Sequence, residues 1–172
     1  MPGKQNQDPI AREPTGPQRL EGLAAITEFI HARIGEARRR LWILSPDLTP
    51  AVYDHAGLTD AVSALARRSR HSDVRILIQD SRSLPVEGHR LVDLALRMSS
   101  RIQLRRHGPD NPALDQSIML VDDRAYLHQP RAADPVALAD ANAPPRVRTF
   151  EDRFRTFWTH AVPDPELRRL KI

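Results

Sequence analysis

The sequence predicts an α/β domain: a mainly parallel β-sheet flanked by helices, with a C-terminal β-hairpin and a final aromatic-rich helix. Amphipathic stripes alternate three times with short apolar runs between residues 18 and 106. Strands that are separated by helices pair in parallel, so this alternation indicates a parallel sheet. Two further apolar runs then flank the turn-like segment 122–124, which is the pattern of a hairpin.

Composition places the chain among ordinary globular proteins and excludes several classes. Its 172 residues fit one domain, with 40% hydrophobic and 28% charged residues. Cysteine is absent, which excludes a disulfide framework, a thiolate metal site and a cysteine nucleophile. No apolar run approaches the ~18 residues that span a bilayer, and the N-terminus lacks the apolar core of a signal peptide. We therefore expect a bacterial, cytoplasmic protein that does not bind membranes.

The first elements follow from proline content and apolar spacing. Residues 1–17 hold four prolines among polar neighbours and predict a disordered leader before a single domain over 18–172. Apolar residues at spacings of three and four predict an amphipathic helix over 18–37. The run 41–44 predicts a buried strand, and 49–53 predicts a short helical turn.

The next elements continue the same rhythm. A second helical stripe begins near Leu58 and ends in arginines, where the helix dipole favours cations. The β-branched run 74–78 is the clearest strand. A third helix starts at about Glu87, and residues 102–106 predict another strand.

The C-terminal third changes character. Residues 116–121 and 125–128 predict the two strands of the hairpin, and the Ala- and Pro-rich segment 130–146 predicts a mobile loop. The last helix carries an aromatic stripe at spacings of four, three and one, which indicates a core rather than a ligand platform. Its residues are Phe150, Phe154, Phe157 and Trp158.

The hairpin segment resembles the H-x-K-x4-D signature of phospholipase D-like half-domains. The aspartate of that motif falls on Asp122, whereas Asp115 stands at the histidine position and Ser117 at the lysine position. The order of strands and helices before the hairpin is also similar to that superfamily. The whole chain resembles an uncharacterised group of bacterial phospholipase D-like domains, some of which are fused to acetyltransferases. This likeness lies in segments 45–48, 88–91 and 164–168.

The resemblance implies a phospholipase D-like fold whose catalytic motif is degenerate. Cleavage in that superfamily uses one imidazole as nucleophile and another as acid, while lysine holds the phosphate charge. Two motifs must face each other, and this chain has one degenerate motif with no internal repeat. We therefore expect a catalytically inactive domain that acts as a binding or protein-interaction module. Its partner would be an unknown protein, encoded on a fused or neighbouring chain, or a second copy in a homodimer.

Polar residues that follow two of the predicted strands define a candidate ligand-binding rim. Its residues are Ser45, Asp47, Asp80 and His89. Together with Asp122, some of these residues could instead form the active site of an enzyme of unknown type. Open α/β sheets bind ligands at the carboxyl ends of parallel strands. In the alternative, which we favour, Asp47 and Asp80 cap helices or fix turns, and His89 caps a helix or fixes a loop.

The sequence gives little support for a metal-binding or cofactor-binding site. Asp115, Asp122 and Asp123 offer oxygen ligands for Mg²⁺, but aspartates in turns usually bond local backbone amides, and we favour that role. The seven histidines show no metal-binding spacing. No glycine-rich phosphate loop is present. We expect no metal and no cofactor.

Local arginine groups keep a nucleic-acid-binding function open. The formal net charge of +4 is too small to indicate it alone. One group follows the second helix, and the other surrounds the strand at 102–106. These residues are Arg67, Arg68 and Arg70 in the first group, and Arg101, Arg105 and Arg106 in the second. Such groups either track a phosphate backbone or are solvated helix and strand ends.

Overall fold

The computed structural model describes residues 16–169, so the predicted leader up to residue 15 lies outside the described residues. The strands are β1 (Gln18–Glu21), β2 (Arg40–Leu44), β3 (Asp73–Ile78), β4 (Ile102–Arg106), β5 (Ser117–Val121), β6 (Ala125–Gln129) and β7 (Val136–Asp140). The helices are α1 (Leu23–Glu36), α2 (Pro50–Tyr53), α3 (Ala56–Arg68), α4 (Arg90–Arg97), α5 (Pro144–Thr159) and α6 (Pro165–Arg169), with a 3₁₀ turn η1 at Ser81–Ser83.

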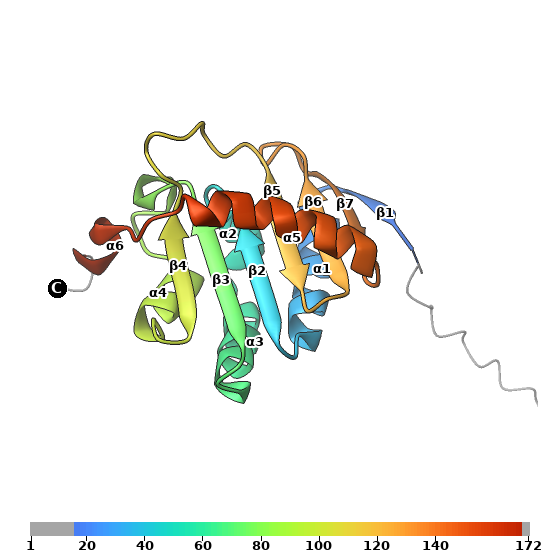
Figure 1. The fold of residues 1–172 in the computed structure, drawn as a ribbon, viewed down its shortest axis with the longest axis horizontal. Helices are drawn as coiled ribbons and strands as arrows, with labels where there is room; N and C mark the ends of the chain where they lie inside the picture. The colour runs from blue at the N-terminus through green and yellow to red at the C-terminus, as the bar shows by residue number, and fades with distance from the viewer. Residues whose placement is uncertain (1–15, 170–172) are drawn as a thin grey trace, which may run out of the picture.

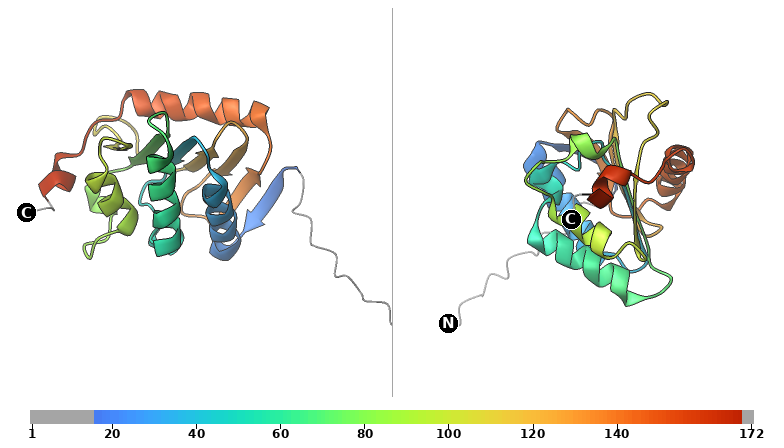
Figure 2. Two further views of the ribbon diagram at one scale, coloured as in Figure 1. Left: turned by 90° about the horizontal axis from the view of Figure 1, so that it is seen from below. Right: turned by 90° about the vertical axis from the view of Figure 1, so that its left-hand side faces the viewer.

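The strands form one seven-stranded sheet in the order β1-β7-β6-β5-β2-β3-β4 (Figure 1). β2, β3 and β4 pair in parallel, and the other neighbours are antiparallel. Helices α1, α3 and α4 cover one face, while α5 alone crosses the other face (Figure 2). The α/β fold class is confirmed, although its antiparallel part is larger than the sequence predicted, because β1 and β7 extend the hairpin.

The predicted helix over 18–37 is wrong at its start. Residues 18–21 form β1, in which only Leu20 is buried, and Gly22 separates this strand from α1. Gly22 has a φ of 89°, a left-handed conformation that suits glycine and ends the strand abruptly. Further along, α4 begins at Arg90, slightly later than predicted.

The prediction of a mobile loop over 130–146 is also wrong for much of its length. β7 lies within it, and α5 begins at Pro144. Ala137 and Ala139 are fully buried in the core that contains Phe29 and Ile30 of α1. Their small side chains let α1 approach β7 closely, so tertiary packing orders a segment whose composition indicates a loop.

Two hydrophobic cores lie on the two faces of the sheet. The larger core joins the sheet to α1, α3 and α4. The smaller core contains the aromatic residues of α5 and Trp42 of β2. The Trp42 and Phe154 rings stack 4.9 Å apart, and those of Phe154 and Trp158 stack 5.7 Å apart. The aromatic stripe is therefore core, as predicted, although Phe157 is only partly buried.

Candidate binding site at the strand ends

Three polar side chains are buried together where β2, β5 and β6 meet. Ser45 follows β2 directly, Ser117 begins β5, and Gln129 ends β6. The register places Leu44 opposite Ile118 and pairs Ser117 with Gln129. These three residues are only 1%, 5% and 8% exposed. Buried polar groups at the end of a sheet are costly unless they find partners, so their grouping marks this end as a candidate site.

Two adjoining hollows open beside these residues. The inner hollow has a volume of about 540 Å³, and its polar lining residues are Ser45, Asp47, Thr49, Tyr53 and Gln129. The outer hollow has a volume of about 470 Å³, and its charged lining residues are Asp47, Asp115 and Arg131. Asp47, Ala132 and Ala133 line both hollows, so the two are continuous over the segment after β6.

Several polar atoms of the inner hollow have spare hydrogen-bonding capacity. Among the described residues, the hydroxyls of Ser45 and Tyr53 find no hydrogen-bond partner. The amide nitrogen of Gln129 donates to the carbonyl of Asp134 at 2.9 Å, which leaves the Gln129 side-chain oxygen as an acceptor. Burial, and then the nearby Asp47 carboxylate, raise the pKa of Tyr53, so its hydroxyl remains a donor.

The Asp47 carboxylate stands at the mouth of both hollows. Its Oδ1 accepts hydrogen bonds from the amide and the hydroxyl of Thr49, each at 3.0 Å. The turn before α2 therefore uses Oδ1 of Asp47, and among the described residues Oδ2 accepts no hydrogen bond. Asp47 therefore fixes the turn before α2 and also lines both hollows, whereas the N-cap residue of α2 is Thr49.

The three positions of the degenerate motif do not form one site. Asp115 and Ser117 lie beside the hollows, whereas Asp122 lies one strand length away, roughly 15–20 Å, at the other end of β5. Asp122 accepts hydrogen bonds from the backbone amides of Arg38, Arg39 and Arg40 at 2.9–3.3 Å. The hypothesis that Asp115, Asp122 and Asp123 gather around Mg²⁺ is therefore wrong, and Asp122 has the turn role instead.

The predicted ligand rim is divided. Ser45 and Asp47 line the inner hollow, whereas Asp80 and His89 serve as caps. Asp80 accepts from the backbone amide and the guanidinium of Arg82 at 2.9 and 2.8 Å. His89 accepts from the Leu91 amide and donates to the Leu48 carbonyl, so both of its ring nitrogens hold backbone groups. An enzyme that uses Asp47, Asp80, His89 and Asp122 at a common point is excluded by this arrangement.

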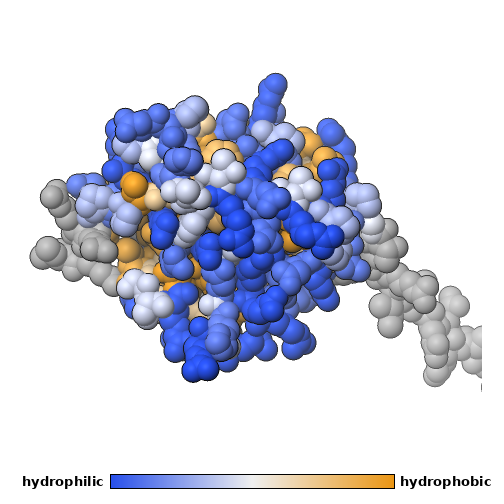
Figure 3. Space-filling model, viewed as in Figure 1, coloured by the Kyte–Doolittle hydropathy of each residue, from blue (hydrophilic) through white to orange (hydrophobic). Residues whose placement is uncertain are grey.

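A second feature, which sequence reasoning missed, is a row of arginines stacked on tryptophans on the α5 side of the sheet. The guanidinium carbons of Arg40, Arg75 and Arg155 lie 4.6–4.8 Å from the Trp42 ring centroid. Arg105 lies 4.5 Å from the centroid of Trp158. We call Arg40, Arg75, Arg105 and Arg155 the arginine row. The face that carries it is mostly hydrophilic (Figure 3).

Acidic residues neutralise only part of the arginine row. Glu151 contacts Arg40 at 3.0 Å and Arg155 at 2.7 Å, and Asp73 contacts Arg75 at 2.9 Å. Among the described residues, Arg105 has no acidic partner. The row therefore carries excess positive charge in a geometry that the aromatic rings hold in place.

The arginine groups predicted from sequence do not combine into one patch. Arg67, Arg68 and Arg70 lie at the end of α3, beside the start of β3. Arg105 and Arg106 end β4, where they pair with Leu77 and Ile78 at the opposite end of β3. Arg101 belongs with the first group, because its guanidinium donates to the carbonyls of Ala66 and Ser69.

Membrane and metal features can be stated only for the described part of the chain. Within residues 16–169 no helix combines the length and the apolar character needed to cross a bilayer. In the same range no cluster of histidine and acidic side chains is arranged to hold a metal ion.

Comparison with solved structures defines the class of fold. Nuc from Salmonella typhimurium, a phospholipase D family member, superposes with a TM-score of 0.60 at 16% identity, over 86% of this chain and 97% of that chain. NucT from Helicobacter pylori gives a TM-score of 0.59 at 13% identity, over 86% and 98%. The fold is therefore phospholipase D-like.

The family is shown by the sequence. Residues 23–170 match the domain of unknown function DUF7931, and the chain belongs to that family. No curated protein sequence matches it. TrmBL2, an archaeal chromatin protein with a novel mode of DNA binding, is also similar in structure, with a TM-score of 0.63 at 16% identity. The match covers 88% of this chain and 55% of TrmBL2.

Proposed function

We propose that this chain is a phospholipase D-like domain without phosphodiesterase activity, working as a binding module in the bacterial cytoplasm. The observation that supports the proposal is the chemistry at the motif position. Among the described residues, neither hollow is lined by a histidine or a lysine, and Asp115 and Asp47 place carboxylates there. A carboxylate repels an anionic phosphate, and the buried Ser117 supplies no cation.

Loss of the nucleophile accounts for the absence of turnover. Removing a catalytic nucleophile typically costs many orders of magnitude in rate, and among the described lining residues of the two hollows no histidine takes its place. The binding partner in this proposal is a protein on a fused or neighbouring chain, a second copy of this chain, or a ligand held in the hollows.

The purified protein is expected to release no p-nitrophenol from bis(p-nitrophenyl) phosphate above the buffer rate, with or without Mg²⁺. The measurement is absorbance of p-nitrophenolate over several hours, with the Asp115→Asn variant as the matched control. Turnover that survives purification and is lost in Asp115→Asn would overturn the proposal. Equal background in both proteins is the result we expect.

A second candidate function, nucleic-acid binding, is favoured by the arginine row. Guanidinium groups stacked on aromatic rings are pre-organised donors for phosphate oxygens. The row runs over β2, β3, β4 and α5 on the sheet face that α5 covers, and Arg105 has no acidic partner among the described residues. The similarity to TrmBL2, described as binding DNA, gives this candidate further support.

Charge reversal should decide where any nucleic acid binds. The double variant Arg105→Glu, Arg155→Glu is expected to lower affinity for labelled DNA by about tenfold and to flatten its salt dependence, because phosphate contacts release counterions. Fluorescence anisotropy at two salt concentrations measures both effects. A double variant of Arg67 and Arg68 at the far end of the sheet serves as the control. If the control loses affinity and the first variant does not, the arginine row is not the interface.

A further inference from the structure

We propose that the inner hollow binds a short aliphatic amine that carries a second hydrogen-bonding group, such as an amino alcohol. In this site Asp47 holds the ammonium group at the mouth, and the buried polar residues hold the other end. The inference rests on the proposed function, because it names the class of molecule that the binding module takes in its inner hollow.

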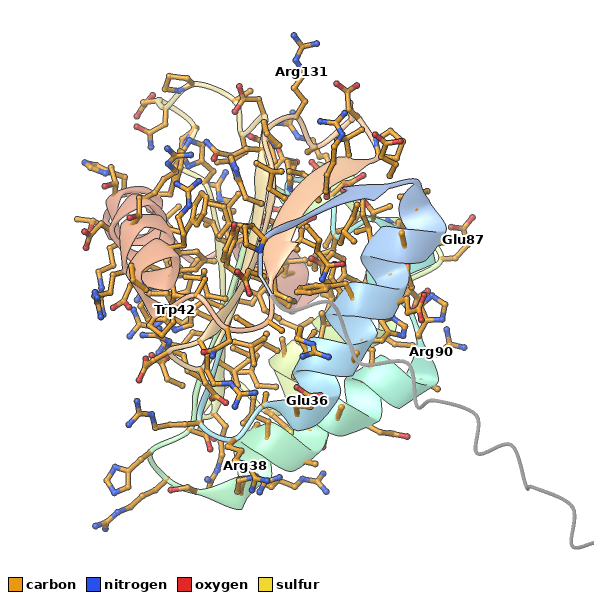
Figure 4. The ribbon with its side chains drawn as sticks, turned by 90° about the vertical axis from the view of Figure 1, so that its right-hand side faces the viewer. Glu36, Arg38, Trp42, Glu87, Arg90 and Arg131 are labelled. Atoms are coloured by element: carbon orange, nitrogen blue, oxygen red, sulfur yellow. The ribbon has the colours of Figure 1, made fainter. Side chains whose placement is uncertain are left out.

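The charge of the inner hollow determines the sign of the charge that its ligand carries. Among its described lining residues, Asp47 is the sole charged group. The cation of the outer hollow, Arg131, lies 3.8 Å from Asp134 and projects away from the molecule (Figure 4). An anion bound here would lie against a carboxylate without a facing cation, which is unfavourable in a partly desolvated site. An ammonium group gains a charge-assisted hydrogen bond to Asp47 instead.

The buried end of the inner hollow sets a second requirement on the ligand, a hydrogen-bonding group at its far end. Ser45 is 1% exposed and Tyr53 is 4% exposed, and among the described residues neither hydroxyl has a hydrogen-bond partner. The side-chain oxygen of Gln129 is an acceptor at the same depth. A hydroxyl or amine at the far end of the ligand would both donate to and accept from these groups. The Ser45 and Tyr53 hydroxyl oxygens are not among the fully buried side-chain atoms that lack a partner, so they face the hollow, where a ligand takes the place of water as their hydrogen-bond partner.

The walls between mouth and base set the length and character of the ligand. Leu23, Ile30, Val52 and Pro135 contribute apolar surface to the hollow. A short methylene chain matches such walls, whereas a sugar would leave its hydroxyls unpaired there. The volume of about 540 Å³ admits a molecule of this size together with water.

Three four-carbon probes that differ at one end test the charge requirement. They are 4-amino-1-butanol, 1,4-butanediol and 4-hydroxybutyrate. We expect 4-amino-1-butanol to shift the backbone amide resonances around Ser45, Asp47 and Gln129 saturably in ¹⁵N–¹H spectra, with a dissociation constant of about 1 mM, which is reasonable for so small a ligand. The diol should bind at least about tenfold more weakly, and the carboxylate should not bind.

Two variants test the residues. Asp47→Asn removes the charge but keeps an oxygen that can accept from Thr49, so the turn before α2 is retained. It should weaken amine binding about tenfold or more. Ser45→Ala, which removes a buried hydroxyl without adding volume, should weaken it about threefold or more. Asp152→Asn, at an exposed position of α5, is the control and should leave amine binding unchanged.

The outcomes separate this inference from the proposed function. Equal binding of the diol and the amine, tighter binding of the carboxylate, or unchanged binding in both Asp47→Asn and Ser45→Ala would overturn the amine site. None of these results would restore phosphodiesterase activity, so the inactive-domain proposal would stand. Cleavage of bis(p-nitrophenyl) phosphate would instead overturn the proposed function.

Discussion

Replacing Asp122 with alanine is expected to lower the free energy of unfolding by about 2–4 kcal/mol. The carboxylate accepts from the backbone amides of Arg38 and Arg39 in the turn before β2 and of Arg40 at the start of that strand. Alanine leaves these donors without their partner. Asp122 also has a φ of 51°, a left-handed conformation that aspartate tolerates better than alanine. Urea unfolding followed by circular dichroism measures the loss.

The neighbouring aspartate provides a matched control in the same turn. Asp123 contacts the guanidinium groups of Arg39 at 2.6 Å and Arg40 at 3.1 Å, but its side chain is 62% exposed. Exposed ion pairs contribute little, so Asp123→Ala should cost less than about 1 kcal/mol. Equal losses in the two variants would contradict the turn role of Asp122, and so would no loss in Asp122→Ala.

The second large effect is a loss of stability in acid that depends on His128. Its ring nitrogen donates to the side-chain oxygen of Gln116 at 3.1 Å, and the ring lies 4.7 Å from that of Phe150. Burial, followed by the charges of Arg153 and Arg146, lowers the pKa of His128 to about 4 from the ordinary 6.5.

The direction of the pH dependence of stability follows from how many protons the folded and unfolded chains bind. Between pH 6.5 and 4 the unfolded chain protonates this histidine while the folded chain does not, so the folded state loses stability as the pH falls through that window. Because the ring is only half-buried and its charge is partly screened by solvent, the contribution is on the order of 2 kcal/mol, fully present above pH 6.5.

Unfolding free energies at several pH values test this dependence. His128→Gln should flatten the curve between pH 6.5 and 4, because glutamine does not titrate. Arg153→Gln should raise the pKa of His128 and recover part of the stability, whereas Arg148→Gln on the same helix should not. Identical curves for the native protein and His128→Gln would show that another group controls the acid response.

Most of the fold follows from patterns within single segments. The β-branched run of β3 and the apolar run of β2 identify strands without tertiary information, and the spacing of the aromatic residues identifies α5. β7 escapes prediction because its buried apolar residues are alanines, which have low strand propensity and pack in the core shared with α1. β1 escapes because Leu20 also fits the spacing of the following helix.

The residues of the candidate site also divide into those that local sequence patterns predict and those that depend on tertiary packing. Ser45 and Asp47 are predictable because they follow a recognisable strand. Gln129 could have been found from the hairpin register, which pairs it with Ser117. Tyr53 and the arginine row have no local signal, since their positions depend on how α2 and α5 pack on the sheet. Asp80 and His89 lie near strand ends, but hydrogen bonds to the backbone use their polar atoms, including one from His89 to the distant Leu48 carbonyl.

The most direct test of the central claim, that the motif position no longer accepts a phosphodiester, is a ¹⁵N–¹H shift titration with dimethyl phosphate. The account predicts no saturable shifts for the amides of Ser45, Ser117 and Gln129 at millimolar concentrations, because Asp47 and Asp115 repel the anion. Saturable shifts confined to those residues would contradict it, since they would show a phosphodiester site that persists without the histidine and lysine of the motif.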